Sequence, residues 1–337
     1  MQLIEFTDKG LYVPQADVYI DPWKPVSKAL ITHGHSDHSR YGMKSYLATH
    51  AAVPVIKHRL GSHNDISGVD YGEVTTINGV KFSFHPAGHI IGSAQIRVEY
   101  KGEVWVASGD YKVANDGLSE PFESVKCHTY ITESTFGLPV FKWKPQAETM
   151  SEINNWWRSN AEKGKVSIIA AYSLGKAQRV INKVDHSIGK IYTHGAVENV
   201  NEVLRNQGVY LKETHRVVQG QKYTEYQGAL IVAPPSAVES AWSNKFKDYS
   251  SGIASGWMAF RGTRRRRSAD RGFVLSDHAD WDGLLTAIKA TECERVFVTH
   301  GYQDIFSKYL GTLGYDSGVV ETEYTGEEVD EKAATAE

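Results

Sequence analysis

The segment ALITHGHSDHSRYG, residues 29–42, places several metal-binding side chains directly after a short apolar run. These side chains are His33, His35, Asp37 and His38. Side chains alternate along an extended segment, so the His-x-His pair puts two imidazoles on the same side. Imidazole nitrogen and carboxylate oxygen are both zinc ligands, and a catalytic zinc site keeps one position for water. The segment contains no cysteine, which argues against a closed structural zinc site. It therefore predicts a catalytic metal centre.

Short β-rich apolar runs recur along the rest of the chain and alternate with helical patterns. Such alternation predicts an α/β fold with layers of sheet and helix. Several expected strands end in a residue that can bind a metal or move a proton, and in open α/β sheets the ligand site lies off the carboxyl ends of the strands. These residues are Asp21, His33, Asp110, Glu133, His278 and His300. We expect them to share one rim.

The composition is that of a globular protein. No apolar run in the 337 residues approaches the roughly 18 residues that a membrane span needs. The N-terminus lacks the basic-then-apolar layout of a secretory signal. The two cysteines, Cys127 and Cys293, are too few for a disulfide framework. We expect a soluble, cytoplasmic protein that makes no contact with a membrane.

The middle of the chain differs from its flanks, because residues from about 150 to 270 contain none of the ligand-type strand ends. We therefore expect a first domain part over 1–150, an inserted domain over 151–270, a return segment over 271–320 and an acidic tail over 321–337. The tail holds seven acids and one lysine, a pattern typical of a frayed, solvated terminus. The remainder is mildly basic, which permits a polyanionic substrate.

The segment THGHSDH resembles the HxHxDH signature of the metallo-β-lactamase fold, and the other motifs of that fold follow in order. Asp21 resembles the first motif, PAGHIIGSAQ the third and ASGD the fourth. ITESTFG, LSDHAD and VTHG resemble motifs A, B and C of its nucleic-acid-processing β-CASP branch. Within this branch, the layout is most similar to the bacterial DNA ligase-associated exonucleases. The resemblance covers roughly residues 10–305.

This resemblance implies a metallo-β-lactamase αββα sandwich with an inserted β-CASP α/β cap domain and an active site in the cleft between them. It also implies two divalent metal ions, zinc first and manganese or iron as alternatives, that clamp a phosphate and activate a water. One ion would be held by His33, His35 and His89, the other by Asp37, His38 and His300, and Asp110 would bridge them.

The resemblance further implies an acid–base pair. His278, paired with Glu133, would protonate the leaving oxygen, and imidazole suits this role because its pKa lies close to working pH. Asp37 belongs to the catalytic set as well as to the ligands. Asp21 would orient the ligand loop from behind.

Two basic segments are candidates for substrate contacts. YSLGKAQRV resembles the start of the β-CASP cap and offers Ser173, Lys176 and Arg179 near the N-terminus of a helix, where phosphates bind. TRRRRSADR contains four consecutive arginines, whose guanidinium groups match phosphate oxygens in a bidentate way. These are Arg264, Arg265, Arg266 and Arg267. A solvated basic turn is the alternative for them.

These features predict a metal-dependent nuclease that hydrolyses DNA phosphodiester bonds, an exonuclease of DNA repair on single-stranded or frayed ends, with a DNA ligase or helicase as candidate partner. An RNA-processing β-CASP ribonuclease is the first alternative, because a histidine at motif C, here His300, is typical of the RNA enzymes. His194 lies in a similar THG string, but the order of the elements favours His300. A small-molecule metallohydrolase and a non-catalytic nucleic-acid-binding scaffold are further alternatives.

Overall fold

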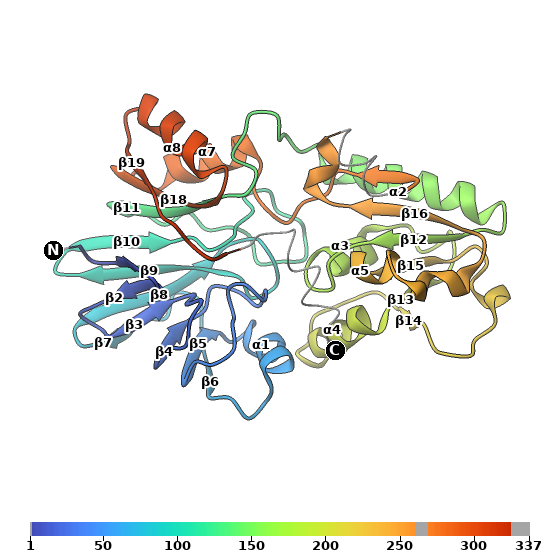
Figure 1. The fold of residues 1–337 in the computed structure, drawn as a ribbon, viewed down its shortest axis with the longest axis horizontal. Coiled ribbons are helices and arrows are strands. Elements are labelled where there is room, and N and C mark those ends of the chain that lie inside the picture. Colours follow the sequence, from blue (N-terminus) through green and yellow to red (C-terminus); the bar gives the residue numbers. More distant parts are fainter. Residues whose placement is uncertain (1, 261–268, 325–337) are drawn as a thin grey trace. The chain divides into compact units, whose positions relative to one another are not determined.

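The computed structural model describes residues 2–260 and 269–324 of the chain. The described residues divide into two compact units, one built from residues up to Lys142 and from residues 277–324, the other from Trp143–Ser276 (Figure 1). The breaks therefore fall at 142/143 and 276/277 instead of the expected 150/151 and 270/271. The reason is that the helix after the first break and the strand before the second both pack in the core of the second unit.

The first unit contains two mixed sheets. The six-stranded sheet has the order β1-β2-β3-β4-β5-β6, with β1 Glu5–Thr7, β2 Gly10–Val13, β3 Val18–Ile20, β4 Lys28–Leu30, β5 Ser45–Thr49 and β6 Ile66–Val69. The seven-stranded sheet has the order β19-β18-β11-β10-β9-β8-β7, with β7 Thr75–Ile77, β8 Val80–Pro86, β9 Ala94–Tyr100, β10 Glu103–Ala107, β11 Thr129–Ser134, β18 Arg295–Gly301 and β19 Asp316–Val319.

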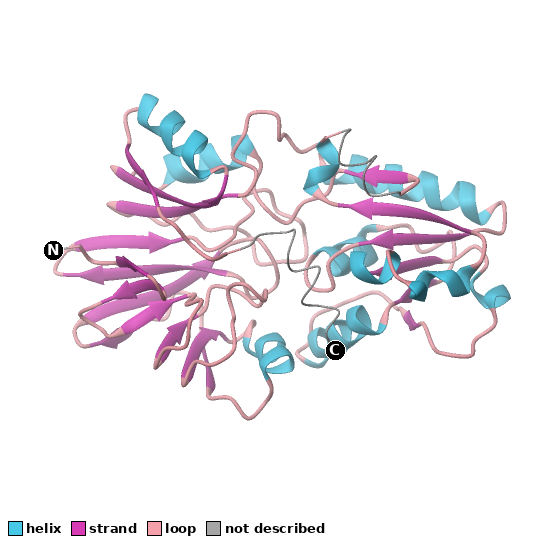
Figure 2. Ribbon diagram, in the orientation of Figure 1, coloured by secondary structure: helices cyan, strands magenta, loops and turns pink. Residues whose placement is uncertain are grey.

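The two sheets of the first unit pack face to face, and helices cover their outer faces (Figure 2). Alternation along β10 shows how the sequence builds these layers, because Trp105 and Ala107 enter the core between the sheets while Val106 faces the helices. The covering helices are α1 Val53–Leu60 on the six-stranded sheet and α7 Trp281–Ala290 and α8 Gln303–Thr312 on the seven-stranded sheet. The layer order is helix, sheet, sheet, helix.

Four neighbouring strands of the seven-stranded sheet run in one direction. Strand β10 pairs in parallel with β11, β11 with β18, and β18 with β19. Their carboxyl ends therefore lie at one edge of the sheet, and the loops that leave this edge come from distant parts of the sequence. This edge carries the candidate functional site.

The second unit is built on a parallel six-stranded sheet of order β14-β13-β15-β12-β16-β17. Its strands are β12 Val166–Ala170, β13 Ile191–Thr193, β14 His215–Arg216, β15 Leu230–Ala233, β16 Tyr249–Ala254 and β17 Arg271–Phe273. Its helices are α2 Gln146–Ala161, α3 Lys176–Lys183, α4 Gly195–Asn206 and α5 Pro235–Val238, with short 3-10 turns at Tyr223–Tyr226, Ala241–Phe246 and Gly256–Ala259.

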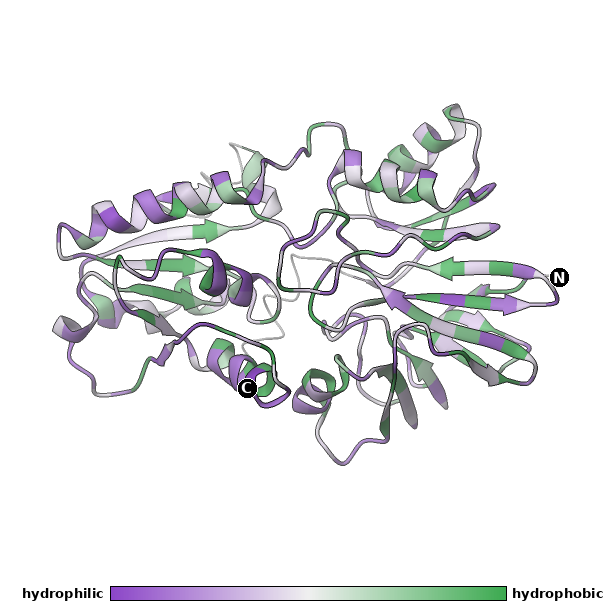
Figure 3. Ribbon diagram, turned by 180° about the vertical axis from the view of Figure 1, so that it is seen from behind, coloured by the Kyte–Doolittle hydropathy of each residue, from purple (hydrophilic) through white to green (hydrophobic). Residues whose placement is uncertain are grey.

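Both faces of this parallel sheet are covered, as its apolar strands require. Ile169 packs with Trp157 of α2 on one face, while Ile168 joins a second cluster around Tyr226 and Phe246 on the other. Figure 3 shows hydrophobic and hydrophilic positions mixed along α2, the pattern of a helix with one buried side. Among the described residues, no helix combines the length and apolar character that crossing a bilayer requires.

Candidate metal centre

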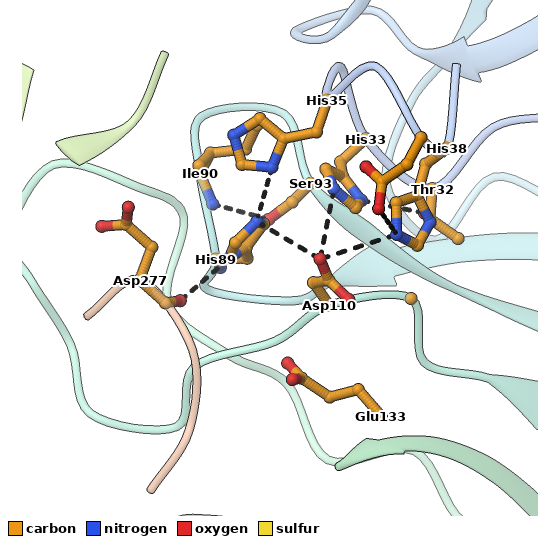
Figure 4. A network of polar contacts seen from close by, with 12 residues as sticks. Thr32, His33, His35, His38, His89, Ile90, Ser93, Asp110, Glu133 and Asp277 are labelled. Atoms are coloured by element: carbon orange, nitrogen blue, oxygen red, sulfur yellow. Dashed lines mark hydrogen bonds and ion pairs between the residues drawn. The ribbon is translucent and has the colours of Figure 1, made fainter. Parts of the chain in front are cut away.

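The expected ligands come from separate loops of the first unit and meet above the carboxyl ends of its strands (Figure 4). All of them except Asp37, together with Glu133 and His278, form three overlapping groups, in each of which one ligand atom per residue lies within 4.8 Å of the others. The groups are His33, His35, His89 and Asp110; His38, Asp110 and His300; and Asp110, Glu133 and His278. Asp110 belongs to all three, so it is the geometric centre of the site.

Asp110 lies three residues after the end of β10 and directs its carboxylate at imidazoles of both histidine groups. Its Oδ2 lies 3.6 Å from Nε2 of His33, 3.6 Å from Nε2 of His38 and 3.8 Å from Nε2 of His89. Two ligand atoms that each lie about 2.1 Å from one tetrahedral ion are about 3.4 Å apart. These separations are too long for hydrogen bonds and suit ligands that share an ion.

The Nδ1 atoms of His33, His38 and His89 are held by groups outside the cluster. His38 Nδ1 donates to Asp21 Oδ2 at 2.7 Å, and His89 Nδ1 donates to the backbone oxygen of Asp277 at 2.9 Å. His33 Nδ1 lies 3.0 Å from Thr32 Oγ1, which itself donates to Asp21. A proton on Nδ1 leaves the Nε2 lone pair for a metal, the usual arrangement behind metal-binding histidines.

Two of these Nε2 atoms provide a direct test of whether a cation fits. His33 Nε2 and His38 Nε2 are buried and have no hydrogen-bond partner among the described residues. A buried polar atom without a partner costs roughly 1–3 kcal/mol. One divalent cation between His33 Nε2 and Asp110, and a second between His38 Nε2 and Asp110, would remove that cost, so the residues fit metal ions.

The electrostatics of the cluster agree with this fit. Burial holds the pKa of His33 and of His89 well below the ordinary value, so both imidazoles are neutral, as ligands must be. Burial also opposes a charge on His38, but the carboxylates of Asp37 and Asp110 outweigh it and raise the pKa of His38 to about 10. The carboxylates thus favour positive charge at this position, which either a proton or a metal cation supplies.

His35 and Asp37 complete the loop. His35 Nδ1 lies 3.0 Å from His89 Nε2, so the two imidazoles can share the first ion. The Asp37 carboxylate lies 3.7 Å from His38 Nε2, but it falls outside the three groups. Its place as a ligand of the second ion therefore stays a prediction.

A β-bulge shapes the rim next to His300. The parallel register between β11 and β18 matches Thr132 with Val298 and Ser134 with Gly301, so two residues of β18, Thr299 and His300, lie opposite one residue of β11. Bulges bend a strand and redirect its side chains. Here the bulge occurs where His300 Nε2 approaches Asp110 Oδ1 to 3.1 Å.

The expected acid–base pair is in contact. His278 Nδ1 donates to Glu133, with distances of 3.0 Å to Oε1 and 2.9 Å to Oε2. Glu133 Oε1 also accepts the backbone N–H of Tyr111 at 2.8 Å, and the side chain is fully buried. Because the carboxylate is held in place from two sides, it fixes the orientation of the His278 ring.

Three supporting groups of this site were not among the expected residues: Thr32, the carbonyl of Asp277 and Tyr324. Thr32 and Asp277 directly precede His33 and His278 in sequence, so their proximity was predictable but their contacts were not. Tyr324 lies in a segment that the sequence analysis assigned to a solvated tail, yet it is 9% exposed. Within the described part of that segment, Glu321 and Glu323 are exposed as expected, whereas the aromatic ring of Tyr324 is buried.

Gly109 supports the loop that carries Asp110, and its replacement is a first test of the site. Its φ is +56°, and a Cβ would lie 2.6 Å from Thr32 Oγ1. We expect Gly109→Ala to destabilise the protein by about 1–3 kcal/mol from overpacking, in addition to about 1–2 kcal/mol for the left-handed backbone. Displacement of Thr32 should also weaken metal binding, measured by thermal unfolding and metal titration.

Gly102→Ala is the matched control for this prediction. Gly102 has a φ of +86°, but a Cβ there would meet nothing within 4 Å. Only the backbone cost applies, so this variant should unfold at a temperature between wild type and Gly109→Ala and should bind metal normally. Equal effects of the two variants would show that the Thr32 contact is unimportant.

The expected substrate contacts of the second unit are less accessible than the sequence analysis assumed. Lys176 is fully buried with its Nζ 4.3 Å from the centre of the Tyr172 ring, and Arg179 donates from Nη1 to the Ser276 oxygen at 2.9 Å. These contacts are those of packing residues. The Ser173 hydroxyl oxygen is buried and has no hydrogen-bond partner in the described part of the chain. Phosphate binding by these residues stays a prediction.

The remaining candidates are the four consecutive arginines and His194. Arg264, Arg265, Arg266 and Arg267 lie outside the described residues. His194, the alternative to His300, lies in the second unit, where its side chain accepts the backbone N–H of Ala196 at the start of α4. It therefore caps a helix.

The fold and the site together define a mixed α/β protein with a buried histidine- and aspartate-lined candidate metal centre. No protein-family model matches the sequence. The chain is 26% identical over 319 residues to a protein of Opitutus terrae named "Probable DNA ligase", in a match that covers 92% of this chain and 30% of the relative. It is 30% identical over 126 residues to "Endoribonuclease YSH1" of Yarrowia lipolytica, which covers 37% of this chain and 15% of the relative.

A third relative is the "RNase J-like protein" of Methanocaldococcus jannaschii, 27% identical over 217 residues, with 53% of this chain and 50% of the relative covered. The chain thus spans half or less of the length of these curated relatives. Its fold is similar to that of a protein of unknown function from Enterococcus faecalis, with a TM-score of 0.56 over 80% of this chain and 74% of that chain at 10% identity. The chain is therefore similar to proteins named as nucleic-acid enzymes.

Proposed function

We propose that this protein is a metal-dependent nuclease of the β-CASP branch of the metallo-β-lactamase fold, and that it hydrolyses DNA phosphodiester bonds as an exonuclease on single-stranded or frayed ends. The observation that carries the proposal is the convergence of three histidine-and-carboxylate groups on Asp110. The buried, unpartnered nitrogens of His33 and His38, within the described residues, give the site its need for a cation.

His33, His35, His89 and Asp110 would hold one divalent ion, and His38, His300 and Asp110, with Asp37 beside them, the other. Bound divalent ions supply positive charge that lowers the pKa of a water and offsets the charge of a phosphate. The chain itself supplies the proton for the leaving oxygen. Glu133 holds the Nδ1 proton of His278, so Nε2 is the nitrogen that delivers a proton, and the carboxylate stabilises the imidazolium form.

The DNA substrate is supported by the extent of one similarity. The match to the relative named as a DNA ligase covers 92% of this chain and so includes residues of both units, whereas the match to the endoribonuclease covers 37%. Since that match occupies only 30% of the ligase-named polypeptide, a DNA ligase is also the partner that we propose for this protein. An RNA substrate is the second candidate, because His300 occupies the motif C position and two relatives are named as ribonucleases or like them.

One assay tests the metal and the substrate together. The protein is stripped with a chelator, reloaded with zinc or manganese, and incubated with 5′-labelled DNA and RNA of identical sequence, single-stranded and as duplexes with frayed ends. We expect degradation of DNA by the reloaded protein only, with weaker substrate binding as salt rises, because phosphate contacts release counterions. His33→Ala should abolish cleavage.

The control for this variant is His58→Ala, since His58 is an exposed residue of α1. Cleavage of RNA alone would establish the ribonuclease alternative in place of the DNA enzyme. Turnover of a thioester or lactone with inert polynucleotides would replace both with a small-molecule metallohydrolase. Full activity of the stripped protein would contradict the metal requirement.

A further inference from the structure

A segment that follows His300, the last expected ligand, also lies at the candidate metal centre. Strand β19 is the outermost strand of the seven-stranded sheet and runs parallel to β18. The residues after Val319 therefore leave the sheet at the same end of the strands as His300. Val320 continues the pairing, because its N–H donates to the Val298 oxygen at 2.9 Å. Residues 320–324 are therefore brought to the rim by sheet topology.

Tyr324 is the residue of this segment that reaches the site. Its ring stacks on the imidazole of His38 with centroids 4.4 Å apart and an interplanar angle of 15°, and it meets the His300 ring edge-on at 5.7 Å. Its hydroxyl donates to the backbone oxygen of Asp21 at 3.0 Å. One side chain thus contacts both histidines of the second subsite and the residue behind them.

These contacts complete the confinement of His38. The ring of His33 lies against it at 4.2 Å between centroids, and Asp21 holds its Nδ1 edge. With Tyr324 stacked on the ring as well, the Nε2 edge that faces Asp110 and Asp37 is the direction left for a ligand. The imidazole is therefore held in the orientation that a metal ion needs.

A second contact anchors the segment beside the ligand loop. Arg40 donates from Nη2 to the backbone oxygen of Glu323, and its Nη1 lies 3.5 Å from a carboxylate oxygen of the same residue. Arg40 also donates from Nε to the backbone oxygen of Asp37 at 3.2 Å. The ligand loop and the C-terminal segment are thus tied to each other through one guanidinium group.

Tyr324 also forms part of the wall of a small cavity behind the second subsite. The cavity has a volume of about 20 Å³, room for about one water molecule, and Asp21, His38, Thr299 and His300 contribute to its lining. Loss of the ring would enlarge this space over the face of the His38 imidazole on which Tyr324 stacks. The imidazole could then turn out of the ligand position.

We propose that Tyr324 is a positioning residue of the second metal subsite, which holds its ion at His38, Asp110 and His300 at full affinity only when residues 320–324 are in place. This inference rests on the proposed metal-dependent function. It extends the working site beyond motif C into the segment that the sequence assigned to the tail. Residues that orient metal-binding histidines typically change metal affinity 10- to 100-fold when replaced.

The test is a metal titration of the stripped, full-length protein with zinc and with manganese, followed by calorimetry. We expect wild type and Tyr324→Phe, which keeps the ring, to bind two ions per chain. Tyr324→Leu should bind the first ion as wild type does, while the dissociation constant of the second rises roughly 10- to 100-fold. A chain that ends at Val320 repeats the test if the leucine variant does not fold.

Tyr315→Leu is the matched control, because Tyr315 precedes β19 and packs partly buried at the opposite end of that strand. Thermal unfolding of the metal-free variants measures the loss of packing common to both. Two ions bound at wild-type affinity by Tyr324→Leu, or equal losses in the two leucine variants, would overturn the inference and leave the nuclease proposal intact. A wild-type chain that binds no ion would overturn the nuclease proposal itself.

Discussion

Replacement of Asp110 by asparagine should remove metal from both subsites and lower nuclease turnover by about 10³-fold or more. Oδ2 of Asp110 faces Nε2 of His33, His38 and His89 at 3.6–3.8 Å, so a single oxygen serves both histidine groups. Asparagine keeps the shape but loses the negative charge. Metal ions contribute several kcal/mol of transition-state stabilisation, and each 1.36 kcal/mol is tenfold in rate. Metal analysis and the labelled-DNA assay measure the two effects.

Asp8→Asn provides the control for this change in the same unit. The Asp8 side chain is 75% exposed and pairs with Lys24 at 3.2 Å, an ion pair of the kind that contributes little. This variant should keep its metal and its turnover. An Asp110→Asn protein that retained two ions and cleaved DNA at the wild-type rate would show that Asp110 is not the centre of the working site.

His278→Gln should separate chemistry from metal binding. Because its Nδ1 is held by Glu133, this histidine presents Nε2 as the proton donor, and loss of general acid catalysis costs typically 10²- to 10⁴-fold in rate. We expect kcat to fall within this range while the metal content stays at two ions and KM changes little. Glutamine keeps a polar side chain at a position that is 2% exposed, which limits the structural disturbance.

His58 is an exposed histidine of α1, so His58→Gln serves as the control and should behave as wild type. Glu133→Gln should lower kcat in the same direction as His278→Gln, since the neutral amide no longer stabilises the imidazolium. Metal analysis decides the interpretation. Depletion of metal from His278→Gln would make His278 a ligand and would remove it from the acid role.

Much of the site was predictable from the sequence for identifiable reasons. The alternation of side chains in an extended segment places His33 and His35 together, and polar residues at strand ends predict a common rim. The mixed α/β class followed from the same alternation of strands and helices and is confirmed by the sheets of both units. The placement of His89 near that loop depended on the resemblance, because His89 is not one of the residues at the ends of the expected strands.

Other features required the tertiary structure. The packing of α2 and β17 into the second core moved both domain boundaries, since a boundary depends on which core an element joins. The burial of Lys176 and the hydrogen bond from Arg179 to the backbone oxygen of Ser276, which is remote in sequence, could not be read from the YSLGKAQRV motif, and phosphate binding by these residues stays a prediction.

By itself, the sequence of this protein determined the chemical types of its ligands, their local spacing and the α/β class, because these depend on side-chain identity and on the period of the backbone. Only the tertiary structure decided that Asp110 lies between two groups of histidines and that Tyr324 stacks on His38. The physical reason is that β10, β11, β18 and β19 run parallel, which brings the ends of distant segments to one edge. Such convergence depends on strand order and register, and no single stretch of the chain encodes it.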